Sequence, residues 1–133
     1  MANKFNWHWQ LVRVNARDIK DVDKKIEYVT NFLGQHKNAH NFERVHNWLR
    51  MTGVAYKGEQ RQKFEEAVAA IENKKDQFAS QEDMDNDLSK APTEHLKKIY
   101  NDLSKRKYGF QFKSVPKAHT EFMADLKAEL ERR

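Results

Sequence analysis

Residues 59–78, EQRQKFEEAVAAIENKKDQF, decide the fold class that we expect for this chain. Phe64, Val68 and Ile71 recur at the three- and four-residue spacing of one helix face. Glu, Gln and Lys fill the opposite face. This pattern predicts an amphipathic helix whose polar face lies in solvent.

The same spacing predicts helices on both sides of this segment. Upstream, apolar residues from Ile19 to Leu33 follow a helical period, and Gly34 stands where a glycine would end that helix. Asn41 can cap a second helix. Downstream, helices are predicted to begin at Ser80, at Thr93 and near Pro116, and Pro92 should stop the first of them.

Two segments depart from this helical pattern. In residues 5–14, FNWHWQLVRV, aromatic or aliphatic residues alternate with polar ones, and residues 108–113, YGFQFK, do the same. A period of two is typical of strands. The sequence therefore predicts a mainly α fold, a small bundle of about five to six helices with a minor two-stranded β element near 5–14 and 108–113.

Length and composition bound the class of protein. The 133 residues fit one domain, 1–133, and the high charged fraction of 34% indicates a well-solvated protein with a thin core. The chain has no cysteine, which excludes disulfides and thiolate nucleophiles. No apolar run approaches the roughly 20 residues of a membrane span, and no secretory signal is visible. We expect a soluble, cytoplasmic protein.

Positive charge is concentrated in residues 104–117, SKRKYGFQFKSVPK, which hold five cations and no acid. Cations can neutralise phosphates while neighbouring rings stack on bases, which favours single-stranded nucleic acid as the partner. The alternative is that Phe110 and Phe112 belong to the core and that Lys105 to Lys107 are ordinary cations at a helix C-terminus. The candidate nucleic-acid-binding residues are Lys105, Arg106, Lys107, Tyr108, Phe110, Lys113, Lys117 and Arg13.

A second candidate surface lies in residues 40–56. Trp48, Arg44 and Tyr56 are of the residue types that dominate protein–protein hot spots. They are the candidate protein-binding residues. The alternative is that Trp48 closes the core against a neighbouring helix.

Metal binding and catalysis find little support. Asp83, Asp85 and Asp87 have the spacing of a calcium-binding EF-hand loop, but Leu88 stands where that loop needs glycine. A capped helix explains this segment better. His36 and His40 are four apart without the further ligands of a zinc site, and no nucleophile or phosphate-loop motif occurs. We expect no enzyme, no metal and no cofactor.

The sequence thus predicts a small, basic, non-catalytic accessory protein that binds nucleic acid through a basic-aromatic patch. The alternative is a protein-binding modulator or inhibitor of a larger nucleic-acid-processing complex. Proteins of this size and style are often viral or encoded by mobile elements. A homodimer through the apolar stripe of Leu126 and Leu130 stays open.

Overall fold

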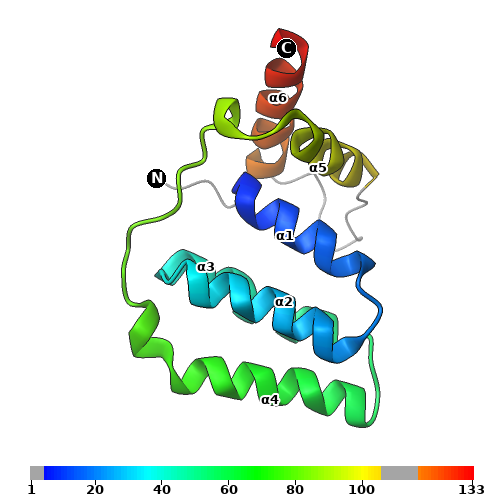
Figure 1. Cartoon of the computed structure of the whole chain (residues 1–133), viewed down its shortest axis with the longest axis vertical. Helices are drawn as coiled ribbons and strands as arrows, with labels where there is room; N and C mark the ends of the chain where they lie inside the picture. The colour runs from blue at the N-terminus through cyan, green and yellow to red at the C-terminus, as the bar shows by residue number, and fades with distance from the viewer. Residues whose placement is uncertain (1–4, 106–116) are drawn as a thin grey trace. The chain divides into compact units, whose positions relative to one another are not determined.

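The computed structural model describes residues 5–105 and 117–133, and all the regular elements within them are helical (Figure 1). Its elements are α1 (Trp7–Asp18), α2 (Val22–Gln35), α3 (Ala39–Gly53), α4 (Glu59–Asn73), the 3-10 turns η1 (Lys75–Phe78) and η2 (Leu88–Lys90), α5 (Thr93–Lys105) and α6 (Lys117–Arg132). The predicted mainly α class is confirmed. None of the helices within these two ranges is both long and apolar enough to cross a membrane.

The strand predicted at 5–14 is wrong, because this segment forms α1. Asn6 caps the helix: its Oδ1 accepts the backbone N–H of His8 at 2.9 Å. Every residue from Phe5 to Ala16 is buried or half-buried. A helix without a solvated face has no amphipathic period to distinguish it from a strand. The other predicted strand, 108–113, lies outside the described residues.

The helix predicted to begin at Ser80 is also wrong. Residues 79–87 have no regular structure, and only η2 follows them. Asp85 accepts the N–H of Asp87 at 2.9 Å through Oδ1, and Asp87 accepts that of Ser89 at 3.0 Å. Such short-range bonds from Asp side chains compete with the helical hydrogen bonds of the backbone.

Several helix boundaries differ from the predicted ones by a few residues. Asn38 caps α3 in place of Asn41, whose N–H it accepts at 2.7 Å. Gly34 lies inside the last turn of α2, and His36 is the capping residue there. The start of α5 at Thr93 agrees with the prediction.

The contacts within the chain divide it into two compact units. Unit 1 comprises Met1–Val14 and Asp85–Arg133, and unit 2 comprises Asn15–Met84. The boundary at Val14 falls inside α1. Unit 1 is therefore assembled from two stretches that lie far apart in the sequence, whereas unit 2 is one continuous stretch.

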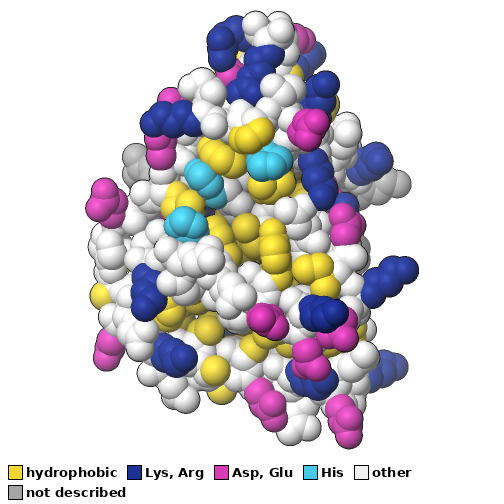
Figure 2. Space-filling model, in the orientation of Figure 1, with side chains coloured by type: hydrophobic (Ala, Val, Ile, Leu, Met, Phe, Trp, Pro, Cys, Tyr) yellow, Lys and Arg dark blue, Asp and Glu magenta, His cyan; other side chains and the backbone are white. Residues whose placement is uncertain are grey.

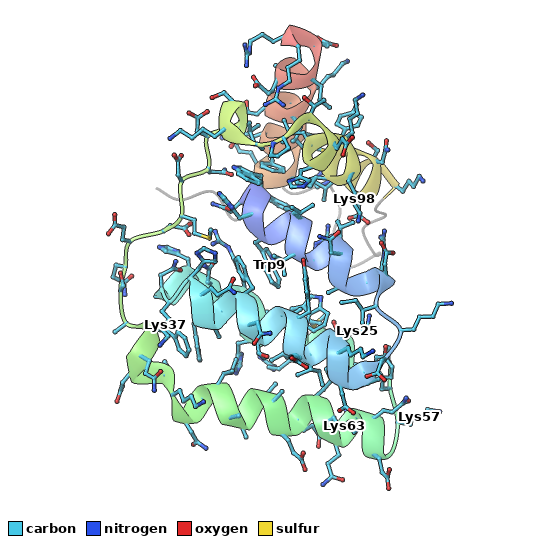
Figure 3. The ribbon with its side chains drawn as sticks, viewed as in Figure 1. Trp9, Lys25, Lys37, Lys57, Lys63 and Lys98 are labelled. Atoms are coloured by element: carbon cyan, nitrogen blue, oxygen red, sulfur yellow. The ribbon has the colours of Figure 1, made fainter. Side chains whose placement is uncertain are left out.

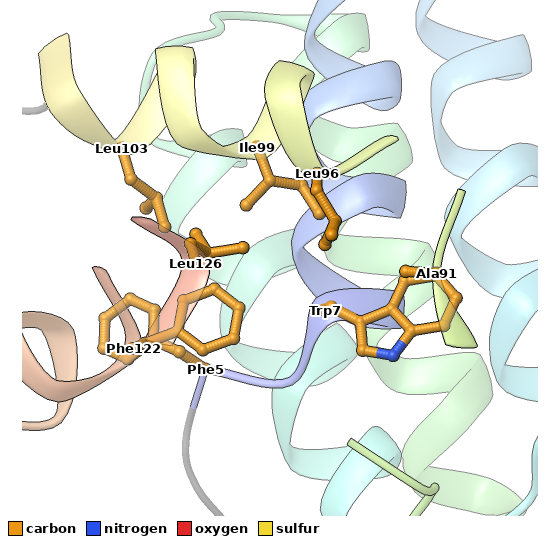
Figure 4. Packing of buried hydrophobic residues seen from close by; sticks show 8 residues of the cluster. All are labelled: Phe5, Trp7, Ala91, Leu96, Ile99, Leu103, Phe122 and Leu126. Carbon is orange, nitrogen blue, oxygen red and sulfur yellow. The ribbon is translucent and has the colours of Figure 1, made fainter. Parts of the chain in front are cut away.

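The core of unit 1 joins the start of the chain to α5 and α6. Phe5 and Phe122 stack with ring centroids 6.0 Å apart. Asn86 fixes the same junction, because its Oδ1 accepts the N–H of Trp7 at 2.9 Å. The buried cluster, shown in Figure 4, consists of Phe5, Trp7, Ala91, Leu96, Ile99, Leu103, Phe122 and Leu126.

Unit 2 is a three-helix arrangement in which α2, α3 and α4 pack against one another. α3 and α4 approach closely at Gly53 and Phe64: a Cβ added at Gly53 would lie 2.9 Å from the Phe64 Cβ. Phe64 is 1% exposed. The absence of a side chain at Gly53 is what lets the ring of Phe64 sit against α3.

We expect Gly53→Ala to destabilise the protein by about 1–3 kcal/mol through overpacking against Phe64. This loss exceeds the gain of about 1 kcal/mol in helix propensity from glycine to alanine. Urea unfolding followed by circular dichroism measures the difference.

Gly34→Ala is the matched control for this prediction. Gly34 lies in the last turn of α2, and an added Cβ meets nothing within 4 Å. This variant should be more stable than the parent chain by about 0.4–1 kcal/mol. Equal effects of the two substitutions would contradict the close packing at Gly53.

Candidate functional site

The two ends of the basic segment lie on helices of unit 1. Lys105 is the last residue of α5 and Lys117 the first of α6, and both side chains are exposed. Lys117 lies 3.8 Å from Glu121, a weak pair on the solvent side of α6. The other candidates on this segment, Arg106, Lys107, Tyr108, Phe110 and Lys113, lie outside the described residues.

α5 adds two lysines that the sequence analysis missed. Leu96, Ile99 and Leu103 face the core of unit 1, which leaves Lys97 and Lys98 exposed. Lys98, labelled in Figure 3, is seven residues before Lys105 and therefore on the same side of the helix. The helical period of the buried leucines and isoleucine was the signal that could have identified both lysines.

Charge is divided unequally between the two units. Unit 2 contains twelve lysines and arginines and twelve acids, so it is formally neutral. Along α4, at the lower edge of Figure 2, cations and acids lie interspersed. The remaining thirteen cations and eight acids belong to unit 1, which therefore carries the entire net charge of +5.

Arg13 has a structural partner. Its Nη2 donates to Oδ2 of Asp102 at 2.6 Å, and its Nε donates to Gln10 Oε1 at 3.0 Å. The side chain of Asp102 is 4% exposed and that of Arg13 is 17% exposed. Arg13 thus neutralises a buried carboxylate of α5 inside unit 1, and it does not point freely into solvent.

Lys25 is a second cation with a structural position (Figure 3). Its Nζ donates to the carbonyl of Ala16 at 2.7 Å and to that of Arg17 at 3.4 Å. These carbonyls belong to the last turn of α1, where backbone C=O groups have no N–H partner within the helix. Burial lowers the pKa of Lys25.

The N-terminal aromatic residues belong to the interior. Phe5, Trp7 and Trp9 are all buried. Their faces are therefore not available for stacking on bases. Within the basic segment, stacking would depend on Tyr108, Phe110 or Phe112, which lie outside the described residues.

Arg44, a candidate protein-binding residue, ties Asp83 of the irregular segment to α3 within unit 2. Its two terminal nitrogens donate to the two carboxylate oxygens of Asp83, each at 2.9 Å. Burial by itself raises the pKa of Asp83, but hydrogen bonds from Arg44 and from the Met84 N–H outweigh it and hold that pKa below its ordinary value. Arg44 and Asp83 thus form a bidentate structural pair.

The other two candidates, Trp48 and Tyr56, lie together around Phe64. The ring of Tyr56 stacks on that of Phe64 at 5.0 Å, and the ring of Trp48 lies 6.2 Å from it. Both candidates are half-buried. Sequence reasoning missed their exposed neighbours Met51 and Val54.

The acids and histidines considered as metal ligands have other contacts. Asp85 pairs with Lys90. The ring of His40 lies 3.2 Å from the Gln81 carbonyl, and the ring of His36 lies 5.3 Å from that of Phe32. Among the residues described, no three His, Asp or Glu side chains gather as a metal site would require.

The apolar stripe of α6 packs within its own chain. Leu126 is fully buried in the core of unit 1, and Leu130 is half-buried beside it. At the end of α6, hydrogen bonds from Arg132 and Arg133 lower the pKa of Glu129 to about 2. These two arginines are therefore partly neutralised, which leaves the net positive charge of unit 1 on α5 and the basic segment.

No protein family, curated protein or solved structure matches this chain. The division of charge, the ion pairs and the exposed side chains described above are therefore the observations on which a function can be proposed.

Proposed function

We propose that this chain is a non-catalytic accessory protein that binds nucleic acid through a basic surface of unit 1. The phosphate contacts of this basic surface are assigned to the five cations of the segment 104–117, Lys105, Arg106, Lys107, Lys113 and Lys117, and the exposed Lys97 and Lys98 of α5 add to the positive potential beside them. The observation that carries the proposal is the division of charge: unit 2 is neutral, and unit 1 carries the whole excess of +5. An excess confined to one unit is suited to a polyanion that binds that unit.

The chemistry of the basic segment favours a single strand. Its five cations occur within fourteen residues without an acid, so they can follow consecutive phosphates. Tyr108 and Phe110 lie within the same run and offer rings on which bases can stack. Bases in a duplex are already stacked on one another and would leave these rings without partners.

A salt titration tests this proposal. About five phosphate contacts to a single strand predict a slope near −3.5 in a plot of log Kobs against log salt concentration. Between about 50 and 200 mM salt the affinity should fall roughly 100-fold. We expect micromolar or tighter binding of fluorescent single-stranded RNA or DNA at the lower salt concentration.

The same measurement contains its own controls. Duplex DNA of equal length should bind more weakly than either single strand, and equal affinity would contradict the stacking contribution of Tyr108 and Phe110. Absence of binding to all three nucleic acids at low salt would overturn the proposed function.

A further inference from the structure

One side of α6 faces away from the core of unit 1. Phe122 and Leu126 project from α6 into the buried cluster (Figure 4). Ala124 lies two residues, or about half a turn, from each of them, so it projects from the opposite side of the helix, where it is exposed. Positions three, four and seven residues from Ala124 share that side. Together with Ala124, these exposed positions form the α6 face: Lys117, Thr120, Glu121, Lys127, Ala128 and Glu131.

Charges of opposite sign flank Ala124 symmetrically on the α6 face. Glu121 lies three residues before Ala124, and Lys127 lies three residues after it. Lys117 and Glu131 lie seven residues before and after it, again with opposite signs. An antiparallel second copy of α6 would therefore place each cation beside an acid of the other chain. We propose that the protein forms a symmetric dimer in which two α6 faces pack antiparallel across Ala124.

The order of the charges identifies the occupant of the α6 face and its direction. In a twofold symmetric contact the same surface serves both copies, so each contact between two residues occurs twice. Glu121 of each copy then meets Lys127 of the other. In a parallel pair every residue would instead lie beside its own copy, and like charges would repel each other.

Small side chains along the middle of the α6 face permit close contact. Thr120, Ala124 and Ala128 are spaced four residues apart and form its central row. In the antiparallel pair Thr120 lies against Ala128, and Ala124 lies against its own copy. Because these side chains are short, the two helix axes can approach to about 8 Å, the lower end of the usual range for packed helices. Such a separation brings Glu121 and Lys127 within reach of each other.

The charged side chains of the α6 face make few contacts within their own chain. Among the residues that the structure describes, Lys127 and Glu131 have no ion-pair partner. Glu121 has a contact of 3.8 Å with Lys117, whose side chain is 89% exposed. Pairing with a second copy would therefore displace water and one weak contact.

The other charged groups of α6 lie beside this face and leave its pattern intact. Glu129 accepts hydrogen bonds from Arg132 and Arg133 and is thus neutralised within its own chain. Asp125 borders the hollow between α6 and η2. The α6 face itself contains two cations and two acids, so two copies carry no net charge toward each other.

This dimer goes beyond the proposed function and shares one residue with it. Lys117 belongs both to the basic surface and to one end of the α6 face. The inner contacts, between Glu121 and Lys127, involve no cation that the proposed function assigns to phosphate. Variants of these two residues therefore test the dimer without changing the basic surface.

Sedimentation equilibrium of the full chain tests the proposal. We expect a monomer–dimer equilibrium with a Kd of roughly 10–100 μM, because two helices of this length bury less area than a standard interface. Glu121→Lys should weaken the dimer at least tenfold, since Lys127 of the other copy then meets a like charge. Glu43→Lys makes the same change of charge at an exposed position of α3 and should alter the Kd less than threefold.

A charge exchange separates antiparallel pairing from general charge effects. Glu121→Lys combined with Lys127→Glu keeps the net charge at +5 and places opposite charges side by side again. This double variant should recover the Kd of the parent chain within threefold. An equimolar mixture of the two single variants should form a heterodimer for the same reason. Ala124→Gln changes no charge and should weaken the dimer at least tenfold by holding the two helices apart.

Three results would overturn the inference. They are a chain that remains monomeric at ten times the expected Kd, equal effects of Glu121→Lys and Glu43→Lys, and a charge exchange that does not restore the dimer. Circular dichroism should show the parent helix content in every variant, which distinguishes lost pairing from unfolding.

RNA binding is measured separately, at nanomolar chain concentration, where the protein is monomeric. The charge-exchange variant should bind single-stranded RNA as the parent chain does. A monomeric chain that binds RNA would contradict only the dimer, whereas a dimer that binds no RNA would contradict only the proposed function.

Discussion

Replacing Lys105, Arg106 and Lys107 together by glutamate should reduce the affinity for single-stranded RNA at least 100-fold at low salt. The change removes three of the five cations of the segment 104–117 and puts repulsive charges in their place. With about two phosphate contacts left, the salt slope should fall from near −3.5 to about −1.4. Fluorescence anisotropy at several salt concentrations measures both quantities.

The matched control carries the same change of charge in unit 2. Lys20, Lys24 and Lys37 are exposed, and replacing all three by glutamate also shifts the net charge from +5 to −1. If the basic surface of unit 1 is the binding site, this control should lose less than tenfold in affinity. Equal losses in the two triple variants would show that RNA responds only to the net charge of the chain.

Arg13→Ala should destabilise the protein by about 3 kcal/mol, because it removes the ion pair that Arg13 makes with the buried carboxylate of Asp102. The pair lies within unit 1, where Asp102 projects from α5 beside the buried Leu103. Urea unfolding followed by tryptophan fluorescence measures the loss. Binding of RNA, assayed where the variant is still folded, should change less than threefold.

A double variant distinguishes the structural role of Arg13 from a role in binding. Arg13→Met combined with Asp102→Leu replaces the pair by apolar side chains of similar volume and should recover most of the lost stability. If Arg13→Ala instead left the stability unchanged and weakened RNA binding tenfold, Arg13 would belong to the basic surface.

The helices that sequence reasoning predicted well are those with one solvated face. The stripes around Phe64 in α4 and Leu96 in α5 lie inward as expected. α1 was mistaken for a strand because burial on nearly all sides removes the polar face from its sequence pattern. The segment 79–87 was mistaken for a helix because its acids bind nearby backbone N–H groups in place of extending a helix.

The candidate sites depended on information that spacing alone does not contain. Arg13 and Arg44 resemble free cations in the sequence, but each has an acid partner that is distant along the chain, Asp102 and Asp83. Exposure of Met51 could not be predicted either, because an apolar residue near Trp48 and Leu49 is as compatible with the core as with the surface. Tertiary packing decides both cases.

The assembly of unit 1 from two distant stretches has a consequence for the order of folding during synthesis. Phe5 leaves the ribosome long before Phe122, its stacking partner, has been made. At about 5–20 residues per second this delay is roughly 6 to 24 seconds. Unit 2 is continuous, so it can fold within that interval. Phe5 and Trp7 therefore lack their packing partners on α5 and α6 during that interval, and unit 1 completes its core after unit 2 has been made.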